Sequence, residues 1–305
     1  MIIAVVGAGT IGLSWAALFA SKGHDVRLYD PRPDLQELLD AAAVELSEVL
    51  PGSWRDRIVL EPDLEAAVTG VDVVQENGPE RLDLKQELFA RIEAAAPPEA
   101  LLLSSTSGLM PSDLGADLTA PGRVVVGHPF NPPHVVPLVE VVPGAQTPAA
   151  TVEAAAAFYR SLGKVPVVLH KEIGGFVANR LQSALFRESV HLVLEGVVTP
   201  EELDQVVTES VGVRWATAGP FESYHLGGGP GGLRHLLEHL GPGMQERWRT
   251  LGQPELTPEV VDRLSTSTHE RFADQPYEQR TAARDRAQLA VLAAREAARG
   301  AAREG

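Results

Sequence analysis

The stretch Gly7-Ala8-Gly9-Thr10-Ile11-Gly12 decides the fold of this 305-residue chain. It follows a short apolar run at residues 2–6 and opens a segment with helical periodicity, and this setting gives the G-x-G-x-x-G pattern its meaning. Gly7 then allows a tight turn, Gly9 lets the backbone approach a pyrophosphate, and Gly12 lets the helix pack closely on the strand. The N–H groups at the helix start, those of Thr10 and Ile11 included, favour phosphates. We therefore predict a dinucleotide-binding turn.

An acidic residue stands where such a turn needs one. The next apolar run, residues 25–29, ends at Asp30, 18 residues after Gly12. An acid there accepts hydrogen bonds from both ribose hydroxyls and repels a 2′-phosphate, which favours NAD over NADP. Arg32 lies two residues further on and softens that preference, so NAD is the predicted cofactor and NADP is not excluded.

Short apolar runs alternate with helical patterns up to residue 173. This alternation is typical of an α/β fold with a Rossmann-type, doubly wound and mainly parallel sheet. The predicted strands are 2–6, 25–29, 71–74, 101–104, 124–126, 138–142 and 165–169. The predicted helices between them are 10–22, 34–49, 82–95, 111–114 and 148–162.

After Gly174-Gly175 only helical patterns follow, interrupted by a glycine-rich loop at residues 227–232. The predicted helices are 176–195, 201–210, 232–239, 258–271 and 277–298. We therefore predict two domains: residues 1–173, which bind the dinucleotide, and residues 174–305, which are all-helical.

Composition excludes several classes of function. The formal net charge of −15 gives no basic surface for nucleic acid or an anionic membrane. The chain has no cysteine, which excludes disulfides, thiolate metal sites and cysteine nucleophiles and fits a reducing cytoplasm. The apolar N-terminal segment is too short for a signal peptide, and no run approaches a membrane span. We expect a cytoplasmic protein with a small-molecule substrate and no metal site.

A histidine and a carboxylate stand out beyond the glycine turn. His128 opens the proline-rich segment His-Pro-Phe-Asn-Pro-Pro after an apolar strand, and Glu140 lies within the apolar run Pro-Leu-Val-Glu-Val-Val. A buried carboxylate is costly unless it is paired, and a histidine held by one is a common general base. On these residues alone, a core histidine bonded to backbone remains the alternative.

Over almost its whole length the chain resembles the 3-hydroxyacyl-CoA dehydrogenase superfamily. The matching segments are 7–12, 76–85, 104–107, 128–140 and 175–181. Phrases such as Ser-Ser-Thr-Ser-Gly-Leu-Met-Pro-Ser and Gly-Val-Arg-Trp-Ala look closest to the branch that holds L-gulonate 3-dehydrogenase (lambda-crystallin), carnitine dehydrogenase and polyketide ketoreductases.

The resemblance implies roles for individual residues. His128 would be the general acid/base and Glu140 its orienting carboxylate, while Ser107 and Asn179 would bind the substrate oxygen. Glu80 and Lys85 would lie near the nicotinamide ribose. The helical domain would dimerise.

The resemblance also implies an NAD-dependent oxidoreductase that interconverts a 3-hydroxy acid and its 3-oxo form, as L-gulonate 3-dehydrogenase does. Arg214 lies in a segment where that branch also has an arginine, and its guanidinium could bind a substrate carboxylate bidentately. A surface arginine in a salt bridge is the alternative. The loop at residues 51–61 offers only Arg55 and Arg57 for a coenzyme A, which disfavours an acyl-CoA. Asn179 argues mildly against carnitine, because that branch often carries Asp there. The alternatives are a polyketide ketoreductase, a 3-hydroxyacyl-CoA dehydrogenase and an NAD-binding structural or sensing protein.

Overall fold

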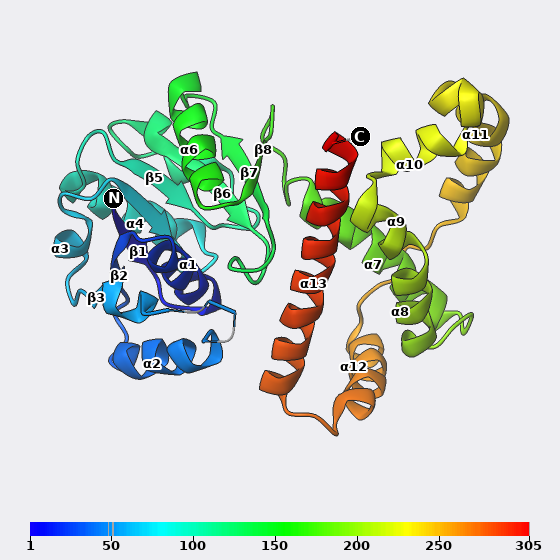
Figure 1. Cartoon of the computed structure of the whole chain (residues 1–305), viewed down its shortest axis with the longest axis horizontal. Coiled ribbons are helices and arrows are strands. Elements are labelled where there is room, and N and C mark those ends of the chain that lie inside the picture. The colour runs from blue at the N-terminus through cyan, green and yellow to red at the C-terminus, as the bar shows by residue number, and fades with distance from the viewer. Residues whose placement is uncertain (48, 51, 305) are drawn as a thin grey trace. The chain divides into compact units, whose positions relative to one another are not determined.

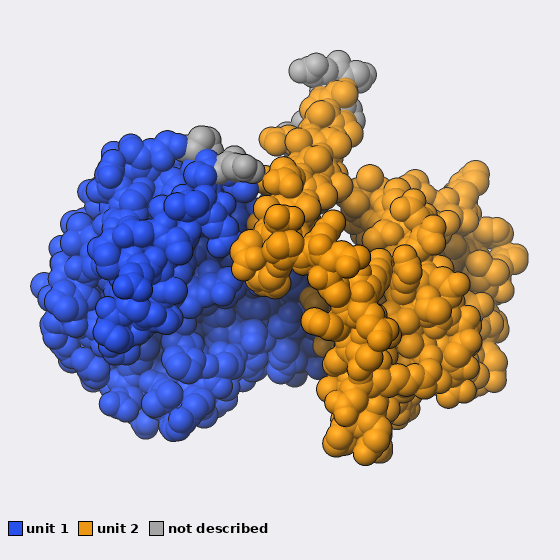
Figure 2. Space-filling model, turned by 90° about the horizontal axis from the view of Figure 1, so that it is seen from below, with its two compact units in different colours: residues 1–180 blue, residues 181–305 orange. Residues whose placement is uncertain are grey.

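A computed structural model describes residues 1–47, 49–50 and 52–304. The chain forms two compact units, residues 1–180 and 181–305, which Figure 2 colours separately. Residue 48 of the predicted helix 34–49, residue 51 of the predicted loop 51–61 and residue 305 lie outside the described residues. The predicted fold class is confirmed, because a mainly parallel sheet with flanking helices precedes an all-helical part (Figure 1).

The first unit is built on one sheet of eight strands. In space the order is β3-β2-β1-β4-β5-β6-β7-β8, and every neighbouring pair is parallel except β6 and β7, which are antiparallel. The strands are β1 (Ile2–Val6), β2 (Asp25–Tyr29), β3 (Ile58–Leu60), β4 (Val73–Glu76), β5 (Leu101–Ser104), β6 (Val124–Pro129), β7 (Leu138–Pro143) and β8 (Val165–Val168).

Helices cover both faces of this sheet. Strand side chains alternate between faces, so Ile3 and Val5 of β1 join one apolar core while Ala4 and Val6 join the other. The first core is closed by α1 (Thr10–Ser21), α2 (Leu35–Glu45) and α6 (Ala149–Ser161). The second is closed by α3 (Leu64–Val68), α4 (Leu82–Ala95) and α5 (Pro111–Leu114). Such strands, buried on both faces, have the continuous apolar runs seen in the sequence.

Two short elements and several element boundaries differ from the prediction. β6 continues three residues past its predicted end, so His128 lies inside the strand, and α2 ends four residues before its predicted end. Neither β3 nor α3 was predicted, because three to five residues are too few to establish a period. The strand predicted at 71–74 instead runs from Val73 to Glu76. Its last two residues, Gln75 and Glu76, are fully buried although polar, because side chains from other elements pair with them. The prediction from apolar residues alone therefore began and ended this strand two residues too early.

The second unit contains helices only, among its described residues. α7 (Ala178–Leu194) begins at the end of the first unit and continues into the second. The others are α8 (Pro200–Glu209), α9 (Val211–Thr217), α10 (Pro220–Gly227), α11 (Gly232–Thr250), α12 (Pro258–Phe272) and α13 (Tyr277–Glu304). α9 and α10 were not predicted, and α11 continues past the predicted end at 239 through Pro242. No described helix is long and apolar enough to cross a membrane.

The loop between β6 and β7 is fastened from two sides. Ser14 of α1 accepts the N–H of His134 at 3.0 Å, and its Oγ lies 2.9 Å from the Nδ1 of the same residue. Lys164, just before β8, donates from Nζ to Pro133 O at 2.5 Å and to Val136 O. Burial lowers the pKa of this lysine to about 7. The helix that starts at the glycine turn thus also fixes the loop after His128.

Replacing Gly127 by alanine should destabilise the first unit. A Cβ at this position in β6 would lie 1.8 Å from the Oη of Tyr159, which is buried and donates to Gln75 at 2.8 Å. Either the tyrosine moves or its hydrogen bond is lost, so we expect the free energy of unfolding to fall by about 3 kcal/mol in urea denaturation. Gly241→Ala is the control, because its added methyl meets no atom within 4 Å and lies in a helix. Equal stability of the two variants would contradict the packing argument.

Candidate active site

The centre of the site is a pair of side chains on adjacent strands. β6 and β7 pair with His128 directly opposite Glu140. His128 Nδ1 lies 2.9 Å from Glu140 Oε2, and the residues are only 5% and 2% exposed. Side chains directly opposite each other in an antiparallel pair lie within reach of one another. The structure therefore brings these two predicted residues into direct contact.

The second oxygen of Glu140 binds the start of α7. Oε1 accepts the N–H of Val177 at 2.9 Å and that of Ala178 at 3.0 Å. A helix leaves its first N–H groups without intrahelical partners, and its positive end favours an anion there. Burial raises the pKa of the Glu140 carboxyl, but the hydrogen bonds from His128, Ala178 and Val177 outweigh burial and lower the pKa below its ordinary value. The group is therefore a carboxylate at neutral pH.

An ionised Glu140 determines which nitrogen of His128 carries hydrogen. A carboxylate only accepts, so Nδ1 must donate, and the lone pair of a neutral imidazole is then on Nε2. The rings of Phe130 and Phe176 flank the imidazole, with centroids 5.2 and 5.3 Å away. His128 is thus fixed in both orientation and tautomer.

Phe176 has an unusual backbone conformation. Its φ of 50° makes it the one non-glycine residue with positive φ in the described part of the chain, and its side chain is fully buried. This turn aims the next two N–H groups, of Val177 and Ala178, at Glu140. A residue in a region that side chains disfavour is held there by its surroundings, and such residues concentrate at functional sites.

Ser107 and Asn179 lie next to each other at the exposed rim. Asn179 Nδ2 donates to the backbone oxygen of Ser107 at 3.3 Å, and Asn179 directly follows Ala178 in the first turn of α7. Ser107 Oγ donates to Glu80 at 3.2 Å. The same Glu80 oxygen accepts from Thr106 Oγ1 at 2.6 Å and from the N–H of Ser107 at 2.9 Å. The turn after β5 is therefore built around Glu80.

Lys85 is buried rather than solvated. Its Nζ donates to both oxygens of Glu76, at 2.6 and 2.9 Å, and lies 3.9 Å from Glu80. Ser104 donates to the same Glu76 carboxylate at 2.6 Å. Sequence reasoning missed Glu76, although a signal was present: this acid lies two residues after the predicted apolar strand 71–74 and nine residues before Lys85. The structure therefore places the two predicted residues Glu80 and Lys85 next to each other, and Glu76 fixes the position of the lysine.

The glycine turn has the form that a dinucleotide requires. A Cβ on Gly7, whose φ is 98°, would lie 2.7 Å from the backbone oxygen of Asn77, and one on Gly12 would lie 1.8 Å from that of Gly7. A Cβ on Gly9 would meet no atom within 4 Å. Gly9 is also the N-cap of α1 and brings no side chain to its free N–H groups. Backbone therefore packs tightly around Gly7 and Gly12, while the space next to Gly9 is open, as the binding of a pyrophosphate requires.

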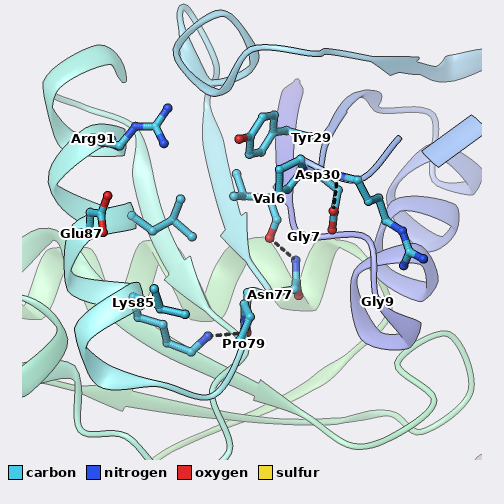
Figure 3. A pocket seen from close by; sticks show the side chains of 15 residues that line it. Val6, Gly7, Gly9, Tyr29, Asp30, Asn77, Pro79, Lys85, Glu87 and Arg91 are labelled. Atoms are coloured by element: carbon cyan, nitrogen blue, oxygen red, sulfur yellow. Dashed lines mark hydrogen bonds between the residues drawn. The ribbon is translucent and has the colours of Figure 1, made fainter. Parts of the chain in front are cut away.

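A cavity of about 650 Å³ lies beside this turn. Its lining includes Gly7, Gly9, Asp30 and Lys85, which were predicted to bind the cofactor. In Figure 3, Asp30 lies at the end of β2 beside the glycine turn. Asp30 Oδ2 accepts the N–H of Ala8 at 2.7 Å, so this acid also holds the turn. The volume and the lining fit an adenosine group.

Arg214 lies in α9 of the second unit. Its side chain is exposed, and among the described residues no hydrogen bond or ion pair engages its guanidinium. The predicted contact with a substrate carboxylate stays a prediction.

The chain matches two family models and several known proteins. Residues 2–173 match the NAD binding domain of 3-hydroxyacyl-CoA dehydrogenase, and residues 175–275 match its C-terminal domain. The L-carnitine dehydrogenase of Streptomyces griseus subsp. griseus is 43% identical over 298 residues, which cover 96% of this chain and 89% of that protein. That of Pseudomonas putida is 41% identical over 297 residues, covering 95% and 92%.

A solved structure matches both units. It is that of 5-formyl-3-hydroxy-2-methylpyridine 4-carboxylic acid 5-dehydrogenase, described as an NAD+ dependent dismutase. The TM-score is 0.81 at 31% sequence identity, with 97% of this chain and 98% of that chain covered.

Replacing Glu140 by glutamine should change how stability depends on pH. The pKa of Glu140 in the folded chain lies below the value of 4.5 expected when unfolded, so its stabilisation is present above that value and is lost as the pH falls through the folded pKa. We expect Glu140→Gln to be less stable than the wild type by about 1 to 3 kcal/mol at pH 7, and the difference to shrink toward pH 4. Urea denaturation at several pH values measures this.

The matched control for this prediction is Glu153→Gln. The side chain of Glu153 is 70% exposed, so this substitution should change the free energy of unfolding little at any pH. A stability difference for Glu140→Gln that stays constant from pH 7 to pH 4 would contradict the assignment of a selectively stabilised carboxylate.

Proposed function

Because the chain belongs to the 3-hydroxyacyl-CoA dehydrogenase family of NAD-dependent oxidoreductases that act on a 3-hydroxy group, we propose that it interconverts a free 3-hydroxy acid and its 3-oxo form with His128 as the general acid/base. The buried contact between His128 and Glu140 carries this proposal. Its geometry matches what a proton-transferring histidine needs, namely one nitrogen fixed by a carboxylate and the other free.

In the oxidative direction, Nε2 of His128 takes the proton of the substrate hydroxyl. The imidazolium that forms is stabilised by the ionised Glu140 at 2.9 Å. Bound NAD supplies the acceptor for the hydride that leaves the same carbon. In the reductive direction His128 returns the proton to the oxygen. The buried phenylalanine at position 176 helps to exclude water from the imidazole.

Ser107 and Asn179 hold the substrate oxygen in this proposal. Their support is the contact between Asn179 Nδ2 and the Ser107 backbone, which holds the two residues together. Of the four hydrogen bonds to Glu80 Oε1, that from Ser107 Oγ is the longest, at 3.2 Å. This hydroxyl is therefore the donor most easily released to a substrate oxygen, where it would stabilise developing charge.

Gly7, Gly9, Thr10, Ile11 and Gly12 bind the pyrophosphate of NAD in this proposal, and Asp30 binds the adenosine ribose. Glu80 and Lys85 lie toward the nicotinamide ribose. The open space above Gly9 and the cavity beside Asp30 support this placement.

A free acid is favoured over an acyl-CoA. Arg55 and Arg57, the two basic residues of the loop before β3, already pair with Asp40 and Asp25, at 3.2 and 3.0 Å. The named relatives act on carnitine and on a pyridine carboxylic acid, which are both free acids. Carnitine is the first substrate to test because of these relatives. L-gulonate follows because of Asn179, and a polyketide 3-oxo acid is the alternative.

We expect a homodimer formed through the second unit. Large apolar side chains are exposed on its helices, including Phe186 (61%), Phe221 (79%) and Trp248 (61%). Apolar exposure of this extent is typical of a surface that another protein covers.

Replacing His128 by asparagine should lower kcat about 10²- to 10⁴-fold, because proton transfer loses its base. The affinity for NADH, measured by fluorescence titration, should stay within about twofold, since His128 does not line the cofactor cavity. His170→Asn, at an exposed histidine, is the control. Unchanged turnover would refute the role of His128. If the wild type binds NADH but turns over none of carnitine, L-gulonate, a polyketide 3-oxo acid and 3-oxobutyryl-CoA, an NAD-sensing protein is favoured.

Replacing Arg214 by alanine should raise KM for carnitine and L-gulonate about tenfold or more, because a bidentate carboxylate contact is lost. The panel includes 3-oxobutyryl-CoA, whose KM should not change. Arg249→Ala removes an exposed arginine paired with Glu246 and serves as the control. A similar effect of Arg214→Ala on the CoA ester would count against a carboxylate contact.

A further inference from the structure

Two charged residues, Asp30 and Arg32, line the cavity next to the glycine turn, and a third, Asp34, pairs with Arg32. Asp30 uses both oxygens to hold the backbone: Oδ2 accepts the N–H of Ala8 at 2.7 Å, and Oδ1 accepts that of Arg32 at 3.1 Å (the acid is labelled in Figure 3). Replacing Asp30 would therefore disturb the glycine turn as well as the ribose site. Asp30 therefore cannot be replaced to change cofactor specificity alone, whereas the side chains of Arg32 and Asp34, which follow it in the chain, do not hold the glycine turn.

Arg32 lines the cavity but is engaged by Asp34. Its Nε lies 2.6 Å from Asp34 Oδ1, and its Nη2 lies 2.9 Å from Oδ2. This is the parallel, two-bond geometry in which a guanidinium binds a carboxylate or a phosphate best. The hydrogen bond between the two side chains lowers the pKa of Asp34 and raises that of Arg32, so both stay charged at neutral pH.

The side chain of Asp34 does not stabilise the helix that it precedes. It is the N-cap of α2, yet its side chain makes no capping hydrogen bond to that helix. Both members of the pair are about half-exposed, at 41% and 43%, so the pair contributes little to folding. The carboxylate of Asp34 can thus be removed without loss of the helix start or the glycine turn.

We propose that Asp34 is a specificity-determining residue: by occupying the guanidinium of Arg32, it keeps that group from binding the 2′-phosphate of NADP and sets the preference for NAD. The acid at Asp30 repels a 2′-phosphate by charge, and Asp34 removes the cation that would offset this repulsion. The preference therefore depends on a residue four positions beyond the ribose acid.

The test compares the binding of 5′-AMP and 2′,5′-ADP, which differ only in the 2′-phosphate, by isothermal titration calorimetry. Asp34→Asn should tighten 2′,5′-ADP about fivefold to tenfold and leave 5′-AMP within about twofold, because one charged hydrogen-bonding group is released. Adding Arg32→Ala to this variant should remove the gain. Arg32→Ala alone should change neither affinity. The ratio of kcat/KM for NADP+ over NAD+ should rise with the 2′,5′-ADP affinity.

The matched control is Asp83→Asn. Asp83 pairs with Arg81 at the same spacing, with Nε–Oδ1 at 3.2 Å and Nη2–Oδ2 at 2.5 Å, and neither residue lines the cavity. The same charge is removed, but no arginine is released near the ribose.

Three outcomes would overturn the proposal: an unchanged affinity for 2′,5′-ADP in Asp34→Asn, a gain that survives Arg32→Ala, or an equal gain in Asp83→Asn. The inference rests on the proposed placement of the adenosine ribose beside Asp30. Failure of the wild type to bind 5′-AMP would overturn that placement too, and this result is distinct from the other three.

Discussion

The carboxylate of Glu140 is the point on which the site depends. A buried charge without partners costs several kcal/mol, and here His128, Val177 and Ala178 supply the hydrogen bonds that offset this cost. Two of these bonds come from the start of α7, so the group that orients the imidazole also fixes the helix that carries Asn179. Glu140 therefore positions both the proposed acid/base, His128, and the helix with the proposed oxygen ligand, Asn179.

A second buried carboxylate organises the other side of the site. Glu76 binds Lys85 and Ser104, and Lys85 in turn approaches Glu80. Glu80 holds the turn that contains Ser107, whose backbone oxygen accepts from Asn179. Contacts thus continue from one buried acid to the other across the carboxyl ends of the strands. Ligands of doubly wound sheets bind in this region, where the strand order reverses between β1 and β4.

Local patterns in the sequence were enough to predict the glycine turn, the fold class, the cofactor and the family. The apolar runs around His128 and Glu140 left a core histidine bonded to backbone as an alternative. The family resemblance implied that the two residues pair, and the structure brings them into contact. Glu76 and Lys85 could not be paired from periodicity, because their contact joins a strand end to a helix. α9 and α10 are too short for a clear period. The relatives support the general reaction but not the choice of gulonate, because substrate choice depends on side chains such as Arg214 that no motif specifies.

Phe176 combines a strained backbone with a fully buried side chain. A side chain in the left-handed region costs about 1 to 2 kcal/mol, and glycine would adopt the same φ of 50° without this cost. Glycine would, however, lose the ring that packs 5.3 Å from the imidazole of His128. The loss of a buried aromatic side chain costs about 3 to 5 kcal/mol, which exceeds the strain, so glycine would lower the stability as well as uncover the imidazole. The strained phenylalanine is therefore the kind of residue that a stabilising redesign should leave in place.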